Sequence, residues 1–182
     1  MLSNPARAAR RLLPLSLALV IGCQDGTAPT LEEHVALHSA SQGVGGRLNF
    51  PLAREVRRAT ARFHSTDQAT EAGYSVASGC VASPAGGMGF HWLNSSLVDP
   101  VFDPLRPEAV LYAPGRDGGL KLVAVEYIVL NVGQPAPTFG SVPFNVGGTP
   151  LPAPHWSLHV WLFRENPNGP FTPFNPSVSC PL

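Results

Sequence analysis

The chain has 182 residues, of which 44% are hydrophobic and only 13% are charged, with 20 prolines and 18 glycines. This composition excludes general disorder and suits one globular domain with long irregular connections. Removal of the three arginines of an N-terminal leader leaves 9 Lys and Arg against 12 Asp and Glu, a net charge of −3, which provides no basic footprint for nucleic acid.

Residues 1–22 have the features of a bacterial secretory signal. Three arginines form a basic region, and the apolar run at 12–21 is too short to span a membrane. The run ends in Val-Ile-Gly-Cys, which resembles the bacterial lipobox, although Val20 stands where Leu is usual. We therefore expect Cys23 to carry lipid and to anchor the protein in the cell envelope. The outer membrane is favoured because Gln24 stands where an Asp often signals retention in the inner membrane. An ordinary signal peptide with an incidental cysteine is the alternative.

Residues 23–48 are rich in small and polar side chains and contain few large apolar ones. We interpret them as a flexible, lipid-anchored tether that precedes a single domain at 49–182. Within the tether, His34 and His38 have the i, i+4 spacing that can bind a metal on a helix. The low apolar content favours solvated histidines on a linker instead.

The chain contains three cysteines, at positions 23, 80 and 180. If Cys23 carries lipid, Cys80 and Cys180 remain as an even pair in a compartment where disulfides persist. A bridge between them would close a loop of roughly 100 residues, worth about 4–5 kcal/mol in the chain-entropy model. Two buried thiols, or Cys80 as a nucleophile, are the alternatives, but the local sequence SGCVAS supplies no base to activate a thiolate.

The first element of the domain is predicted to be helical. Proline suits the first turn at position 51, and apolar residues then recur at helical spacing, at Leu52, Val56, Ala59 and Phe63. Ser65 followed by Gln68 resembles a capping box for a second short helix, and Gly73 fits its C-terminal stop. We expect the apolar stripe of this segment to pack against a sheet.

The chain beyond this helical segment is predicted to consist of strands and loops. The small residues at 80–89 indicate a loop that leads into the segment GFHWL. Residues 109–113 are a strand candidate, and the sequence GRDGG at 115–119 favours a hairpin because its residues tolerate positive φ. The hairpin would place 109–113 antiparallel to the strand that follows.

Residues 120–130, LKLVAVEYIVL, form the longest apolar run outside the leader, and their β-branched side chains favour a strand covered on both faces. Simple alternation puts Glu126 on one face with Leu122, Ala124 and Ile128. Glu126 is therefore a carboxylate in the middle of a face that is otherwise core. A buried charge needs a partner, and the internal cations considered for this role are Arg54, Arg106, Arg116 and Arg164.

Residues 131–154 are rich in proline and glycine. A loop of this length is often a functional lid, whereas the alternative is extended chain crossing the sheet edge, with 138–139 and 142–146 packed as a minor strand.

The next strand is predicted at 155–163, with the sequence HWSLHVWLF. Alternation puts three of its larger polar or aromatic side chains on one face, those of His155, His159 and Trp161. These elements predict an α+β domain with a mainly antiparallel β-sheet, as a sandwich or partial barrel, an N-terminal helical segment and long Pro/Gly-rich loops.

Several segments are similar to those of a family of uncharacterised secreted bacterial proteins. They are GGMGFHWLN at 86–94, RPEAVLYAP at 106–114, LVAVEYIV at 122–129 and LHVWLFRENPNGPFTPFNPSVSC at 158–180. The resemblance covers roughly residues 55–182 and supports one domain there. It implies no activity and no functional residues, because we know of no established activity for that family.

Three ionisable residues, His91, Glu126 and His159, lie within apolar strand-like segments. Two histidines and a carboxylate are the ligand set of many metal sites, including non-haem iron centres with open positions, and strands can direct such groups into one cavity. A site for a divalent transition metal is therefore one hypothesis for these residues. A polar pocket without metal and a purely structural network are the alternatives. His155 should not share an ion with His159, because four residues along a strand span about 13 Å.

Aromatic residues flank these histidines, and Trp92 and Trp161 are candidates for stacking a flat ligand, although aromatics at strand alternation are more often core. Other catalytic schemes lack support in the sequence. It has no His-x-His motif of the cupin type, no Gly-x-Ser-x-Gly elbow, no His-Glu-x-x-His and no phosphate-binding or dinucleotide-binding glycine loop. A carboxylate pair of Glu126 with Glu108 or Asp99 for glycoside chemistry is not favoured by the spacing.

Three functions are compatible with this sequence. The first is a cell-envelope lipoprotein whose domain binds a small ligand or a metal ion in a pocket formed by His91, Glu126 and His159. The second is a metal-dependent enzyme that uses the same three residues as ligands. The third is a structural or interaction lipoprotein without a catalytic site. A tightly bound ion would favour the first two, and turnover alone would separate them.

Overall fold

A computed structural model describes residues 50–148 and 151–180 of the chain. The predicted signal peptide at 1–22, the lipidation site Cys23 and the tether at 23–48, with its two histidines, lie outside the described residues. Within the described ranges, none of the helices is long and apolar enough to cross a membrane.

The described chain begins with the helical segment that the sequence predicts. It consists of α2 (Pro51–Thr60), the 3₁₀ turn η1 (Ala61–His64) and α3 (Thr66–Glu71). Pro51 occupies the first turn of α2, where a missing N–H is tolerated. The side chain of Ser65 accepts a hydrogen bond from the backbone N–H of Gln68, and Gly73 follows α3 with a φ of 94°. The predicted cap and the predicted glycine stop are both confirmed.

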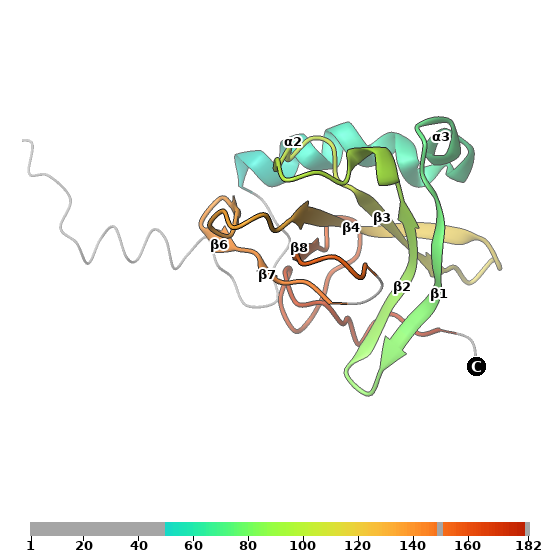
Figure 1. Ribbon diagram of the computed structural model, residues 1–182. Helices are drawn as coiled ribbons and strands as arrows, with labels where there is room; N and C mark the ends of the chain where they lie inside the picture. The colour runs from blue at the N-terminus through green and yellow to red at the C-terminus, as the bar shows by residue number, and fades with distance from the viewer. Residues whose placement is uncertain (1–49, 149–150, 181–182) are drawn as a thin grey trace, which may run out of the picture.

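The main sheet has six antiparallel strands in the order β1-β2-β3-β4-β8-β7. Their bounds are Ser75–Ser83 (β1), Gly86–Leu93 (β2), Ala109–Pro114 (β3), Leu120–Leu130 (β4), Asn145–Val146 (β7) and His155–Val160 (β8). A short 3₁₀ turn, η2 (Ser95–Leu97), follows β2. Two further strands, β5 (Thr138–Phe139) and β6 (Val142–Pro143), form a separate two-stranded sheet. The main sheet curls into a half-barrel, with the helices across one face (Figure 1). The α+β prediction is confirmed.

Two buried clusters cover the two faces of the sheet. The larger cluster packs the helical segment against one face and includes Val56, Phe63, Tyr112, Tyr127 and Leu158. Within it, the Tyr112 hydroxyl donates to the Phe63 carbonyl at 2.6 Å and so fastens η1 to β3. The smaller cluster lies on the opposite face and includes Leu111, Ile128, Trp161 and Val178. The C-terminal segment therefore supplies part of the cover on that second face.

Residues 80–89 form strands of a hairpin, and the prediction of a loop there is wrong. β1 pairs with β2 through a turn at residues 84–85. The small side chains allow close approach of other chain segments, because a Cβ at Gly87 would meet Val178 and a Cβ at Gly89 would meet the Tyr112 carbonyl. Glycine weakens the sequence signal of a strand, yet it also marks places where two backbones come close.

Side chains do not alternate regularly along the whole of β4. The register with β3 shifts between Leu111 and Tyr112, which makes Val123 an extra residue in a β-bulge. Its carbonyl accepts two backbone N–H groups from the chain that follows β8. Leu122, on the N-terminal side of the bulge, consequently packs in the helix-covered cluster and does not share a face with Glu126 as predicted. Glu126 lies beyond the bulge, where alternation holds.

The described part of the segment 131–154 is extended chain along the sheet, with minor strands where the sequence indicates them. Its anchors are Phe139 and Phe144, whose side chains are buried in the helix-covered cluster. After these anchors, β7 pairs with β8 and becomes the last strand of the main sheet. The segment thus completes one edge of the half-barrel.

The predicted disulfide between Cys80 and Cys180 is confirmed. The bond joins β1 to the C-terminal segment across 100 residues of sequence, with the two Cα atoms 5.6 Å apart. Nearby, the backbones of Gly87 and Asn175 pair as an isolated antiparallel bridge. The C-terminal segment is therefore held against the first hairpin at two points.

Candidate metal centre

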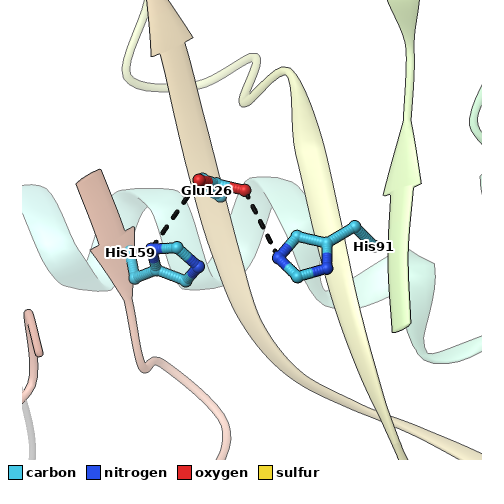
Figure 2. A group of neighbouring side chains, drawn as sticks. All are labelled: His91, Glu126 and His159. Carbon is cyan, nitrogen blue, oxygen red and sulfur yellow. Dashed lines mark ion pairs between the residues drawn. The ribbon is translucent and has the colours of Figure 1, made fainter. Parts of the chain in front are cut away.

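Three strands of the sheet bring together His91, Glu126 and His159, which we call the triad. Glu126 in β4 and His159 in β8 are direct cross-strand partners. His91 lies in β2, beyond β3, and strands two positions apart are separated by about 10 Å. The β3 residue opposite Glu126 is Ala109, whose small side chain lets His91 and Glu126 approach each other across β3. Figure 2 shows the two imidazole rings on either side of the carboxylate.

The three side chains converge without forming hydrogen bonds to one another. His91 Nε2 lies 3.6 Å from Glu126 Oε2, and His159 Nδ1 lies 3.7 Å from Glu126 Oε1. One nitrogen or oxygen atom from each residue lies within 4.8 Å of the other two. An N–H···O hydrogen bond measures about 2.7–3.2 Å. The observed spacing therefore leaves room for a further atom between the three groups.

All three residues are buried, with relative exposures of 6% for His91, 8% for Glu126 and 6% for His159. Burial lowers the pKa of both histidines, that of His159 to about 4, so both rings are neutral at pH 7. Burial also raises the pKa of Glu126, although His91 and His155 partly oppose that rise. Neither histidine of the triad therefore offers Glu126 a full positive charge.

The internal cation considered in the sequence analysis is not found. Within the described residues, the ion-pairing partners within 4 Å of Glu126 are His91 and His159, and it pairs with none of Arg54, Arg106, Arg116 and Arg164. A buried carboxylate without a compensating charge is unfavourable. Glu126 must therefore either hold a proton or face a cation that no side chain supplies.

The hydrogen bonds around His91 favour a proton on Nδ1 over one on Nε2. The Ser78 hydroxyl donates to the Gly79 carbonyl at 2.9 Å, so its oxygen is left as an acceptor. His91 Nδ1 lies 3.0 Å from that oxygen and donates to it in this arrangement. In the neutral ring, Nε2 then presents its lone pair to the Glu126 carboxylate. Two electron-rich atoms that face each other at 3.6 Å require either a proton on Glu126 or a cation between them.

His159 contains a buried nitrogen without a partner. Among the described residues, Nε2 of His159 makes no hydrogen bond, while Nδ1 faces Glu126 at 3.7 Å. An unsatisfied buried polar atom costs about 1–3 kcal/mol. Figure 2 shows that the His159 ring projects toward the space between Glu126 and His91. Both nitrogens of this ring are therefore unsatisfied by protein atoms at hydrogen-bond distance.

The ligand types and their spacing fit a divalent transition metal. Two imidazole nitrogens and one carboxylate oxygen suit ions such as Zn²⁺, Fe²⁺ or Mn²⁺. Metal–ligand bonds of about 2.0–2.1 Å in a tetrahedral site place the ligand atoms about 3.4 Å apart. The distances of 3.6 and 3.7 Å around Glu126 are only slightly longer. Three protein ligands would leave at least one coordination position open.

The triad forms part of the wall of a cavity of about 410 Å³. His155 and Ser157 of β8 also line the cavity, together with apolar side chains that include those of Met88, Ile128 and Leu151. His155 Nδ1 donates to the backbone carbonyl of residue 153 at 2.8 Å, and His155 does not belong to the group that could hold one ion. This placement agrees with the expectation that His155 and His159 do not share an ion.

Trp92 and Trp161 lie away from this cavity. Side chains alternate across β2, so Trp92 lies on the opposite face from His91 and packs against Tyr112, with ring centroids 5.1 Å apart. The indole of Trp161 donates to the Thr172 carbonyl, and its ring lines a different cavity. Neither indole lines the cavity beside the histidines, contrary to the expectation from their proximity in sequence.

Sequence reasoning missed the roles of Ser78 and Glu108. No pattern marks Ser78, because its contact with His91 depends on the pairing of β1 with β2. Glu108 is only 1% exposed, its Oε2 accepts the Ile128 N–H at 2.8 Å, and burial raises its pKa to about 8. Neither Glu108 nor Asp99 is among the described residues that line the cavity. The cavity therefore does not hold the carboxylate pair considered for glycoside chemistry.

No protein-family model, no curated protein and no solved structure matches this chain. The resemblance to secreted bacterial proteins therefore stays a prediction. The function has to be inferred from the chemistry of the site itself.

Proposed function

We propose that this protein binds one divalent transition-metal ion through His91, Glu126 and His159. The observation that carries the proposal is the convergence of three buried ligand atoms within 4.8 Å, with no hydrogen bond between them. The sequence-based prediction of a lipid anchor at Cys23 would place this binding in the bacterial cell envelope.

A metal would give each of the three residues a partner at once. The lone pair of His91 Nε2 would have an electron acceptor in place of a carboxylate. Glu126 would have a compensating positive charge. His159 Nδ1, which faces Glu126 at 3.7 Å without a hydrogen bond, would gain a partner. Ser78 would orient His91 through its other nitrogen, as outer-shell acceptors commonly do for metal-bound histidines.

A metal-dependent enzyme is the second candidate. The observation that favours it is the cavity of about 410 Å³ beside a centre with only three protein ligands. An open coordination position that faces a cavity can hold water or a substrate oxygen. No reaction follows from the residues alone, and measured turnover would separate this candidate from a binding protein.

The test is elemental analysis of the full chain, purified without chelator and without a histidine tag. We expect close to one equivalent of a transition metal, either on isolation or after reconstitution with Zn²⁺, Fe²⁺, Mn²⁺ or Cu²⁺. Glu126→Gln and His159→Ala should each lose it, because two remaining protein ligands hold an ion weakly.

His155→Ala is the matched control. His155 is a buried histidine on the same strand face as His159 and lines the same cavity, but lies outside the triad. This variant should keep the metal. Wild-type protein that remains empty after reconstitution with all four ions would refute the proposal, and so would equal metal content in the wild type and Glu126→Gln.

A further inference from the structure

The cavity beside the triad has the size of a small-molecule site. Its volume is about 410 Å³, which falls within the range of about 300–1,000 Å³ that is typical of ligand pockets. A second cavity borders His91 and Glu126 on the side of Ala109, but it measures only about 200 Å³. The larger cavity is therefore the place where an organic ligand could reach the metal.

The lining of this cavity is mostly apolar and contains a single carboxylate. Met88, Ile128 and Leu151 contribute apolar surface, and the polar neighbours outside the triad are uncharged serine and asparagine side chains and His155. No lysine or arginine is among the described residues that line it. A negative group on a ligand would therefore have to be balanced by the metal rather than by a side chain.

A charge count at the metal then sets the charge of the ligand. A divalent ion carries two positive charges, the Glu126 carboxylate supplies one negative charge, and the imidazole rings of His91 and His159 supply none, because a histidine binds a metal in its neutral form. One positive charge remains in a buried site, where an unbalanced charge is costly. A ligand with one anionic oxygen group cancels it. A neutral ligand leaves it, and a dianion reverses it.

We infer, on the basis of the metal site proposed above, that the cavity takes a small organic monocarboxylate. One carboxylate group of this ligand occupies the open position on the metal, and its apolar body packs against Met88, Ile128 and Leu151. The ligand class follows from the remaining single charge, the absence of lining cations among the described residues and the apolar wall.

The test uses the full chain loaded with Co²⁺ and three probes of similar size. Benzoate is the monoanion, benzamide is its neutral counterpart, and phthalate is the dianion. Affinities are measured by calorimetry, and the Co²⁺ absorption spectrum reports entry of a ligand into the coordination sphere. We expect benzoate to bind at least 10-fold more tightly than either other probe and to change the spectrum. Removal of the metal should abolish the preference.

Ser157→Phe is the variant that fills the cavity without removing a ligand of the metal. Ser157 is half-buried and lies between His155 and His159 on the cavity-facing side of β8. The variant should retain one equivalent of Co²⁺ and lose at least 10-fold in benzoate affinity. Should this variant fail to fold, relaxation of benzoate ring protons in wild-type protein, compared between Co²⁺ and diamagnetic Zn²⁺, measures the proximity of the probe to the metal.

The outcomes distinguish the two proposals. Metal binding with no preference for benzoate, or with a preference that survives metal removal, overturns the ligand class and leaves the metal site standing. Benzoate protons that relax equally in the Co²⁺ and Zn²⁺ proteins also overturn it. A chain that binds no metal at all overturns both proposals.

Discussion

Two glutamates are buried in this sheet, and their surroundings give them different roles. Glu108 accepts a backbone N–H from Ile128, so its side chain substitutes for a peptide group just before the start of β3. Glu126 faces two neutral imidazole rings at distances beyond hydrogen bonding. Glu108 thus has a backbone hydrogen-bond donor, whereas Glu126 has no donor at hydrogen-bond distance among the described residues. The difference indicates a structural role for Glu108 and agrees with the metal-ligand role proposed for Glu126.

Glu108→Gln is expected to change how stability depends on pH. Burial raises the pKa of Glu108 from 4.5 to about 8, so the folded protein keeps this proton after the unfolded chain has released it. Stability contributed by the protonated group is complete below pH 4.5 and is lost as pH rises to about 8, by up to about 1.4 kcal/mol per pH unit. Glutamine keeps the acceptor for Ile128 and does not ionise. Chemical denaturation should show that, between pH 5 and pH 8, the free energy of unfolding of the variant rises relative to that of the wild type by on the order of 4 kcal/mol.

The control for this experiment is Glu55→Gln, which changes an exposed glutamate on α2. Its stability should follow that of the wild type at every pH. The difference between Glu108→Gln and the wild type removes the contributions of the buried histidines, which are common to both proteins. A difference that stays constant from pH 5 to 8 would show that Glu108 ionises alike in the folded and unfolded chains.

Ser78→Ala should weaken metal binding without abolishing it. The Ser78 oxygen lies 3.0 Å from His91 Nδ1, and outer-shell partners of this kind are worth about 10–100-fold in metal affinity. Competition with a chromophoric chelator measures the loss, with one equivalent still bound at saturation. Ser83→Ala is the control, since Ser83 lies in the same strand and caps the hairpin turn instead. Equal affinities of Ser78→Ala and the wild type would contradict the positioning role.

At the scale of elements, local chemistry predicts the helical segment, the hairpin at 115–119 and the two long strands. Helix caps and turns depend on a few consecutive residues. The cap at Ser65, the stop at Gly73 and the GRDGG turn could therefore be recognised without knowledge of the fold. The bulge at Val123 could not, because it depends on the register between β3 and β4. The strands at 80–89 were missed because glycines and small residues have a low strand propensity. They are needed there because neighbouring chain segments come too close for larger side chains.

Three Gly→Ala substitutions should separate backbone strain from steric overlap. Gly79 has space for a Cβ and ordinary φ, so its replacement should be neutral or stabilise by up to about 1 kcal/mol. Gly118 also has space but has a φ of 76°, which costs about 1–2 kcal/mol with a side chain. Gly89 has a φ of 94° and the Tyr112 carbonyl in the way, so the loss should reach about 3 kcal/mol or more. Denaturant midpoints rank the three variants by their loss of stability. Equal losses of stability for Gly89→Ala and Gly118→Ala would mean that the strands separate to admit the methyl group at Gly89.

At the scale of the whole molecule, the sequence identified the three candidate ligands but not their convergence. A histidine or glutamate inside an apolar strand is visible as an anomaly in one segment. That His91 and Glu126 meet requires the order β2-β3-β4-β8 and a small residue, Ala109, between them. Strand order and facing are non-local properties, and the same uncertainty explains why Trp92 was expected beside a ligand although it faces the helices.

Because the three ligands come from three strands, metal binding should stabilise the folded sheet as a unit. An ion that binds only the folded state, at 100 times its Kd, raises the free energy of unfolding by about 2.7 kcal/mol. Denaturation with metal or with chelator measures this gain, which Glu126→Gln should lose and Glu55→Gln should keep. In chelator, Glu126→Gln should be no less stable than the wild type, because it removes a buried ionisable group without breaking a hydrogen bond between the triad residues. Marked destabilisation in chelator would instead indicate that Glu126 serves the fold, as in the purely structural alternative.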